Sequence, residues 1–322
     1  MKKVAFLVLA MIAALPAGAA TAEETGEYIF ILKARGNPYW QAVVDGINET
    51  AKAQGISASV HQLSSDSAAE EQLNLCQAVL ARQPKFLAIS AVTTSVGIEC
   101  VKEAAARGII VADMDSSISI AEADKAGVHL AFSVGSDNYQ IGKNAADYLK
   151  TIAGAPTAKI FVLEGVAGSI PARKRADGFT DEVRKVLPQA KVIASISADW
   201  DRLKAMNVTT DILQREPGLN VIYAANDMMA LGAAEALRVA GKTDQISVIG
   251  VDGVADARRA VMEGKLTATV AQLPYLIGKR SVEKAVAAVK GEPTEQLEIT
   301  PTPVLTRQFM ESGTDPLLQY VR

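Results

Sequence analysis

The sequence predicts an α/β protein built from two doubly wound lobes, each a parallel sheet covered by helices. The chain has 322 residues, of which 49% are apolar and 21% are charged, which is the balance of a soluble globular protein. Short β-branched runs alternate with helical patterns along nearly the whole chain, as in consecutive βαβ units. About ten strands are many for one open twisted sheet, so we expect two sheets.

The first residues predict an export signal rather than part of the fold. A short basic start at residues 1–3 leads into an apolar run at residues 4–14, and Ala20-Thr21-Ala22 has the small-x-small pattern of a cleavage site. The apolar run is too short to span a membrane. We therefore expect a signal peptide over residues 1–22, cleavage after Ala22 and a periplasmic protein.

The expected elements follow in order from this point. The strands are expected at residues 28–32, 57–61, 86–90, 109–112, 132–135, 159–163, 191–195, 220–223, 246–251 and 267–271. The first helix, residues 38–53, has Asn37 as a plausible N-cap and Pro38 at its first position. Further helical patterns cover residues 68–82, 95–107, 137–152 and 228–240. No linker-like segment marks a boundary, and residues 135–137 are the best candidate for a first crossing between lobes.

The two cysteines fall in consecutive predicted helices. Cys76 lies in the helix over residues 68–82, and Cys100 lies in the helix over residues 95–107. Consecutive helices on one face of a parallel sheet are neighbours, so a disulfide between them is possible in an oxidising periplasm. The alternative is two buried free thiols that behave as small apolar side chains. We treat Cys76 and Cys100 as a disulfide candidate.

Polar and aromatic side chains gather just after the predicted strands, where open α/β sheets bind ligands. These residues are Lys33, Asn37, Tyr39, Trp40, Asp113, Asp115, Trp200, Asn226, Asp252 and Gln272, with Arg175 on the helix after the strand at 159–163. Taken singly, an Asp or Asn at a strand end usually caps the next helix or turns the chain. Taken together, they predict one polar crevice.

The chemistry of this set suits a neutral polyhydroxy ligand. Carboxylates accept hydrogen bonds, Arg donates several, and Asn or Gln does both. Aromatic rings offer flat apolar faces to the C–H bonds of a sugar ring, while charge-assisted hydrogen bonds offset the desolvation of its hydroxyls. We therefore expect a ligand that carries hydroxyl groups around a ring edge and C–H bonds on its faces.

Several other function classes lack the residues that they need. The sequence has no G-x-S-x-G, H-E-x-x-H or G-x-G-x-x-G motif, so we expect no enzyme and no cofactor. With only two His and two Cys, a multi-ligand metal site is improbable. A net charge of -3 lacks the excess of positive charge that binds nucleic acid. The pair Asp113 and Asp115 leaves an exported carbohydrate-active enzyme as an alternative.

Five short segments together resemble the periplasmic sugar-binding proteins of ABC importers, in the type I group that includes ribose- and allose-binding proteins. The segments are Lys33 with residues 37–40 (NPYW), residues 198–202 (ADWDR), 225–227 (AND), 251–253 (VDG) and 269–272 (TVAQ). The resemblance implies two α/β lobes joined by a three-segment hinge, with crossings near Gly135, Gln272 and Glu298. Lobe 1 would comprise residues 23–135 with 272–297, and lobe 2 residues 136–271 with 298–322.

The same resemblance implies a ligand-binding set and partners. The set is Lys33, Asn37, Tyr39, Trp40 and Asp115 on lobe 1, Arg175, Trp200, Asn226 and Asp252 on lobe 2, and Gln272 at the hinge. Tyr39 or Trp40 would stack on one face of the sugar and Trp200 on the other. The partners would be a monosaccharide or hexitol ligand, an ABC permease and its ATPase. The alternative is a sensory binding protein that docks on a chemoreceptor or a sensor kinase.

Two positions bear on the choice of sugar. Ribose binders of this group have an Arg directly after the aspartate that matches Asp115, whereas this chain has Ser116. The ribose binders also lack a lysine at the position of Lys33, and the allose-type binders have one. The resemblance therefore points away from ribose and toward an allose-like hexose, a ketohexose or a hexitol.

Overall fold

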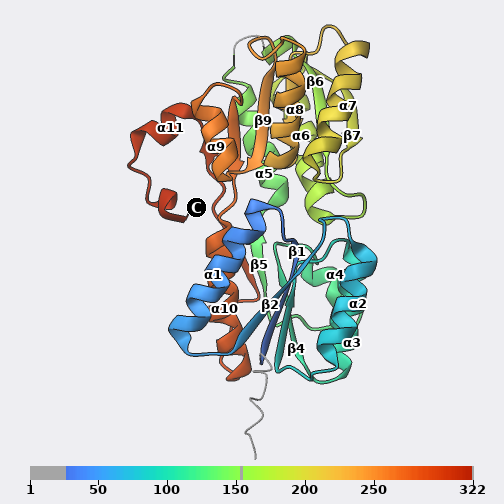
Figure 1. Ribbon diagram of the computed structural model, residues 1–322, viewed down its shortest axis with the longest axis vertical. Helices are drawn as coiled ribbons and strands as arrows, with labels where there is room; N and C mark the ends of the chain where they lie inside the picture. Colours follow the sequence, from blue (N-terminus) through green and yellow to red (C-terminus); the bar gives the residue numbers. More distant parts are fainter. Residues whose placement is uncertain (1–26, 153–154, 321–322) are drawn as a thin grey trace, which may run out of the picture.

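The computed structural model describes residues 27–152 and 155–320, which form two lobes stacked along the long axis of the molecule (Figure 1). The expected signal peptide and its cleavage site after Ala22 lie outside the described residues. Each lobe contains a six-stranded sheet with helices on both faces. The fold is therefore the predicted pair of doubly wound α/β lobes.

The first lobe contains nine elements from the first part of the chain and two from near its end. In chain order they are β1 (Tyr28–Ala34), α1 (Pro38–Gln54), β2 (Ala58–Leu63), α2 (Ala69–Leu80), β3 (Phe86–Ile89), α3 (Thr94–Ala106), β4 (Ile110–Met114), α4 (Ile120–Lys125), β5 (Ser133–Ser136), α10 (Pro274–Val289) and β11 (Leu297–Thr300). The strand order is β11-β5-β4-β3-β1-β2, and all pairs are parallel. Tyr28 of β1 is in register with Ala58 of β2 and Phe86 of β3.

Alternating side chains of β1 bury two different faces of this sheet. Phe30 and Leu32 belong to the hydrophobic cluster that includes α1 and α10 residues, whereas Ile29 and Ile31 belong to the cluster of α2 and α3. This alternation follows from the two-residue period of a strand. Figure 1 shows α1 and α10 on one side of the sheet and α2 and α3 on the other.

The second lobe repeats this plan. Its elements are α5 (Asn138–Leu149), η1 (Ala155–Thr157), β6 (Lys159–Glu164), α6 (Ile170–Val186), β7 (Lys191–Ser197), α7 (Arg202–Arg215), β8 (Val221–Ala224), α8 (Asp227–Val239), β9 (Ser247–Asp252), α9 (Ala255–Met262), β10 (Ala268–Ala271) and β12 (Val304–Leu305). The order is β12-β10-β9-β8-β6-β7, with β12 antiparallel to β10 and the other pairs parallel. Helices α5 and α6 pack together, as do α7 and α8.

The chain passes between the lobes at three places, and the third differs from our expectation. The first passage follows β5, which ends at Ser136, and the second joins β10 to α10 through Gln272. We expected lobe 1 to end at Leu297 and the third crossing to lie near Glu298. Instead, β11 continues to Thr300, because its residues pair with β5 as far as Ser136. The crossing therefore occupies residues 301–303.

Two short elements close the described chain. Helix α11 (Arg307–Ser312) contacts β12 of the second lobe, and the 3-10 helix η2 (Pro316–Tyr320) contacts α10 of the first lobe. Within residues 27–152 and 155–320, no helix has both the length and the apolar character needed to cross a membrane.

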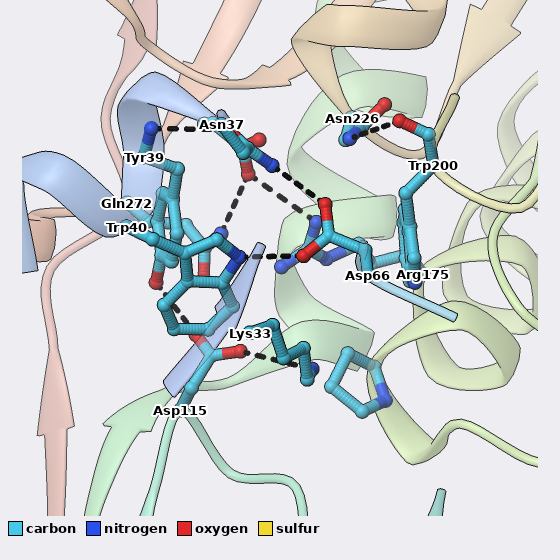
Figure 2. A pocket seen from close by; sticks show the side chains of 12 residues that line it. Lys33, Asn37, Tyr39, Trp40, Asp66, Asp115, Arg175, Trp200, Asn226 and Gln272 are labelled. Atoms are coloured by element: carbon cyan, nitrogen blue, oxygen red, sulfur yellow. Dashed lines mark hydrogen bonds and ion pairs between the residues drawn. The ribbon is translucent and has the colours of Figure 1, made fainter. Parts of the chain in front are cut away.

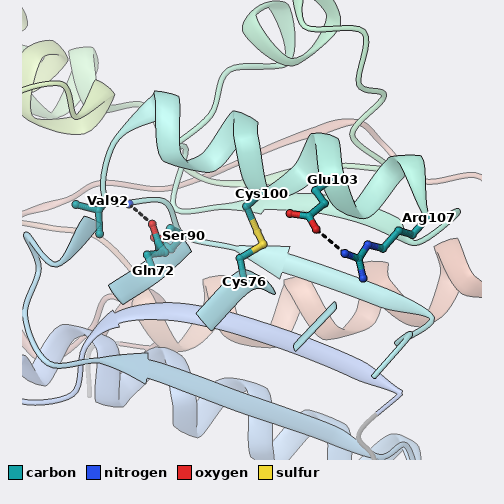
Figure 3. Close-up of a disulfide and its surroundings, with 7 residues drawn as sticks. All are labelled: Gln72, Cys76, Ser90, Val92, Cys100, Glu103 and Arg107. Carbon is teal, nitrogen blue, oxygen red and sulfur yellow. Dashed lines mark hydrogen bonds and ion pairs between the residues drawn. A yellow bond between two sulfur atoms is a disulfide. The ribbon is translucent and has the colours of Figure 1, made fainter. Parts of the chain in front are cut away.

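Cys76 of α2 and Cys100 of α3 form a disulfide in this structure (Figure 3). The two cysteines are nearly inaccessible to solvent and belong to the same apolar cluster as Ile29 and Ile31 of β1. The bridge therefore joins two neighbouring helices on one face of the first sheet, and the alternative of two free thiols is set aside.

Candidate ligand-binding site between the lobes

All ten predicted site residues line one cavity between the lobes, at the carboxyl ends of both sheets. The lining residues are Lys33, Asn37, Tyr39, Trp40, Asp66, Asp115, Pro171, Arg175, Trp200, Asn226, Asp252 and Gln272. Figure 2 shows side chains of both lobes turned toward one another across this space. We call it the cleft. Its position agrees with the rule that open parallel sheets bind ligands beyond their strand ends.

Asn37 both caps a helix and faces the cleft. Its Oδ1 accepts a hydrogen bond of 3.0 Å from the backbone N–H of Tyr39, and Pro38 occupies the first turn of α1. The cap fixes the start of α1, so Tyr39 and Trp40 both leave the first turn toward the cleft. Their rings meet edge to face with centroids 4.8 Å apart.

Asp115 sits at the centre of a buried polar group on the first lobe. The Tyr39 hydroxyl donates to Oδ1 of Asp115 at 2.5 Å, and Nζ of Lys33 lies 3.8 Å from Oδ2. Burial, with the charge of Asp115 added to it, raises the pKa of Tyr39 well above its usual value, so the phenol remains a donor. Lys33 also lies 5.3 Å from the centroid of the Trp40 ring.

Arg175 is the corresponding cation of the second lobe. Its Nε donates to Asn138 Oδ1 at 2.8 Å, while Nη1 donates to the carbonyl of Ala225 at 2.7 Å and lies 3.4 Å from Asp252 Oδ1. Helices α5 and α6 cross so closely here that a Cβ on Gly142 would lie 2.3 Å from the carbonyl oxygen of Arg175. The glycine thus permits the approach that fixes the Arg175 backbone.

Trp200 forms the aromatic wall of the second lobe. Its indole lies against Gly165, where a Cβ would stand 2.1 Å from the ring, so the ring needs a glycine at that position. Asn226 caps α8 by accepting from Met229 N at 2.9 Å, and its Nδ2 donates to the carbonyl of Trp200 at 3.4 Å. The Arg175 guanidinium lies 5.5 Å from the ring centroid.

Asp252 and Gln272 meet at the hinge end of the cleft. Gln272 Nε2 donates to Asp252 Oδ1 at 2.7 Å. Burial raises the pKa of Asp252 to about 7, although the charge of Arg175 opposes this shift. Among the described residues, Gln272 Oε1 is a buried oxygen without a hydrogen-bond partner. Because buried polar atoms are rarely left unpaired, this acceptor suggests that a donor arrives from a ligand.

Three residues of the cleft adopt backbone angles that only glycine adopts readily. Asp115, Trp200 and Asp252 have φ values of 66°, 66° and 121°, and the neighbours Ser116 and Asp199 are also in the positive region. Such conformations cost on the order of 1–3 kcal/mol each and cluster at functional sites. The strain therefore supports the assignment of the cleft as the functional site.

Asp66 belongs to the cleft but was missed in the sequence. It lies just after β2 and accepts hydrogen bonds from the Trp40 indole and the Asn37 amide. The run Ser64-Ser65-Asp66 at the end of this strand is the same kind of signal that identified Asp115. We found no cleft candidate there because the predicted strand ended at residue 61, two residues before the observed end of β2.

Asp113 turns away from the cleft. Its Oδ1 accepts from the backbone N–H groups of Ser117 and Ile118, and its Oδ2 accepts from the hydroxyl of Ser133. Because it is not among the cleft residues, Asp113 and Asp115 do not form the paired carboxylates that a glycosidase would need.

Two hinged lobes around a polar, aromatic-walled cleft define a solute-binding protein, and comparison with known proteins agrees. The periplasmic binding protein domain family matches residues 28–293. The chain belongs to this family. The result confirms the predicted fold and the resemblance to the periplasmic sugar-binding proteins of ABC importers.

Individual relatives cover most of the chain. The chain is 35% identical to the D-allose-binding periplasmic protein of Escherichia coli over 275 residues, which are 85% of this chain and 88% of that protein. It is 36% identical to the ribose import binding protein of Escherichia coli over 91% of this chain and 94% of that protein. A solute-binding protein of Actinobacillus succinogenes, solved with bound D-allose, superposes with a TM-score of 0.81 at 28% identity over 88% of this chain and 99% of that one.

Proposed function

We propose that the chain is the solute-binding component of an ABC sugar importer and that a neutral hexose is its ligand. The observation that carries this proposal is the buried Gln272 Oε1, which lacks a hydrogen-bond partner and lies beside Asp252 at the hinge end of the cleft. A hydroxyl of the sugar donates to this oxygen, and neighbouring hydroxyls on the sugar ring donate to the carboxylates. The names of the relatives, which bind D-allose or import ribose, point the same way.

Each lobe supplies one aromatic face and one group of charged residues. Tyr39 or Trp40 stacks on one face of the sugar ring and Trp200 on the other. Asp115 and Asp252 accept hydrogen bonds from hydroxyls, and Arg175 donates to a ring or hydroxyl oxygen. Only the closed arrangement of the lobes completes this set, so ligand binding favours closure. The closed surface is what the permease, the membrane partner of the ATPase, then recognises.

Two features support a hexose rather than ribose. Ser116, at the position where ribose binders carry an Arg, turns its hydroxyl toward the carbonyl of Ser136 and is not a lining residue of the cleft. Lys33 is buried beside Asp115 and Trp40, as expected for an allose-type site. D-Allose is therefore the first ligand to test, with ketohexoses and hexitols next.

This role places the mature chain in the periplasm after cleavage behind Ala22. It requires no cofactor, and the sugar leaves the cleft chemically unchanged. Mass spectrometry of the exported protein reports the cleavage position, and chromatography of the sugar recovered from the cleft shows whether it has been altered.

The proposal is tested by calorimetric titration of protein stripped of carried-over ligand by unfolding and refolding. We expect binding of D-allose and much weaker binding of ribose. Asp252→Ala should lose about 1–3 kcal/mol of binding free energy, because a buried partner is left unpaired. Asp211→Ala, which removes an exposed acid from α7 of the same lobe, is the matched control. Equal affinity of Asp252→Ala and the wild type would show that the site is wrongly assigned.

A further inference from the structure

Asp66 joins the two residues that form the outer part of the first-lobe wall. Its Oδ1 accepts from the indole Nε1 of Trp40 at 2.7 Å and from the backbone N–H of Ala34 at 3.1 Å. Its Oδ2 accepts from Nδ2 of Asn37 at 3.0 Å. Figure 2 shows the indole nitrogen and the amide nitrogen both pointing at this carboxylate. One side chain therefore satisfies three donors from the β1–α1 segment.

These contacts determine how Trp40 and Asn37 face the ligand. A tryptophan held only by packing can turn about its side-chain torsions, whereas a hydrogen bond to Nε1 fixes the plane of the ring. Asn37 cannot exchange its amide oxygen and nitrogen, because Oδ1 already accepts from Tyr39 N at the cap of α1. Its Nδ2 must therefore find an acceptor, and Asp66 supplies it.

Asp66 comes from a different segment than the residues that it holds. Loop residue Asp66 follows β2, which is the edge strand of the first sheet, and its carboxylate is only partly buried. The Ala34 bond pins this loop to the end of β1. The orientation of the wall thus depends on a long-range contact between two loops rather than on α1 alone.

We propose that Asp66 is a positioning residue for sugar binding, which sets the ring plane of Trp40 and the amide of Asn37. This inference rests on the proposed sugar-binding function. Loss of the carboxylate weakens ligand binding through the freed indole and amide, while the fold is retained.

The first experiment observes Trp40 without any ligand. The chain has two tryptophans, so protein labelled with ¹⁵N at the indole nitrogen gives two indole signals, and Trp40→Phe assigns one of them. Asp66→Ala should move the Trp40 signal and speed its exchange with solvent, and it should leave the Trp200 signal in place. Asp66→Asn should keep the indole bond through its carbonyl, but its amide group then faces the Asn37 donor.

The second experiment measures D-allose affinity by calorimetric titration. Asp66→Ala should weaken binding about tenfold, as expected when a charged acceptor is lost. In a Trp40→Phe background, the factor by which Asp66→Ala weakens D-allose binding should be at least about twofold smaller than in the wild type, because the two residues act together. Asp124→Ala removes an exposed acid from α4 of the same lobe and should leave both readouts unchanged.

The outcomes separate the two proposals. If the wild type does not bind D-allose, the proposed ligand is wrong, while the indole signals still report whether Asp66 holds Trp40. An unmoved Trp40 signal in Asp66→Ala overturns the positioning role, and so does wild-type affinity in a variant that has kept its melting temperature. Strictly additive losses in Asp66→Ala and Trp40→Phe also contradict it.

Discussion

Asp113 and Asp115 stand two residues apart at the end of β4, and their carboxylates have different surroundings. Asp115 faces the cleft with Tyr39 and Lys33, whereas Asp113 is fully buried beneath the following loop. Three donors of that loop, from Ser117 and Ile118, converge on one Asp113 oxygen. The same residue type thus faces the cleft at one position and holds a loop at the other.

Burial shifts the pKa of Asp113, and this shift should make the free energy of unfolding depend on pH. Desolvation raises its pKa from 3.8 to about 7, even though hydrogen bonds from Ser133, Ser117 and Ile118 oppose this. The folded state therefore holds the proton more tightly than the unfolded chain. The resulting stability is present below about pH 4 and is lost as the pH rises through about 7.

We predict that Asp113→Asn removes this part of the pH dependence. Asparagine is neutral, can accept from the loop donors and can donate to Ser133, so it mimics the protonated acid. Urea unfolding between pH 4 and 8 should show a smaller loss of stability with rising pH than in the wild type. The difference should be on the order of a few kcal/mol at most. Parallel curves for the two proteins would contradict the assignment.

At the scale of elements, local signals predicted the strands from β1 to β10 but not the two strands near the end of the chain. Asn37 and Pro38 predicted the start of α1, and β-branched runs predicted all ten strands from β1 to β10. The strands β11 and β12 were not predicted, because β11 exposes its apolar side chains Leu297 and Ile299 and β12 has two residues, so that both depend on pairing with distant strands. This is why the third crossing was placed three residues too early.

The disulfide between α2 and α3 is an element-scale feature with a measurable effect. The bonded residues are 24 positions apart, and a loop of this size restricts the unfolded chain by about 3.5 kcal/mol in the chain-entropy account. Reduction should therefore lower the free energy of unfolding by about this amount. The bridge lies away from the cleft, so affinity for D-allose in the folded protein should not change.

A double variant, Cys76→Ala with Cys100→Ala, provides the matched comparison. It should unfold identically with and without dithiothreitol, whereas the wild type should lose stability in the reductant. If reductant destabilises both proteins equally, the disulfide is not the source of the effect.

At the scale of the whole molecule, the site exists only because two lobes bring their strand ends together. Position after a strand predicted nine of the cleft residues, since parallel strands share one carboxyl edge, and Arg175 lies on the helix that follows β6. The contacts among them could not be predicted, because the bond of Asp252 to Gln272 and that of Trp40 to Asp66 depend on loop paths. Asn37 and Asn226 each cap a helix and line the cleft, and for Asn37 both roles were predicted from the sequence.

The lobes touch in this structure at a point beyond the cleft residues. The backbone N–H of Thr94, at the start of α3, donates to the carbonyl of Gly168 in the second lobe at 3.3 Å. Gly168 has a φ of 81°, which favours glycine, and a Cβ added at this position would lie 3.5 Å from the Thr93 side chain. One hydrogen bond of this kind contributes about 1 kcal/mol, so it adds little to the stability of the closed arrangement.

We therefore predict that the sugar-free protein is more open in solution and that D-allose closes it. Small-angle X-ray scattering should give a larger radius of gyration for the stripped protein, which falls to the value of the closed structure as sugar is added. Ligand can shift this equilibrium only through its higher affinity for the closed state. Asp252→Ala should need a higher sugar concentration than the wild type for the same decrease in radius. A radius that is the same with and without sugar would mean that the lobes close independently of ligand.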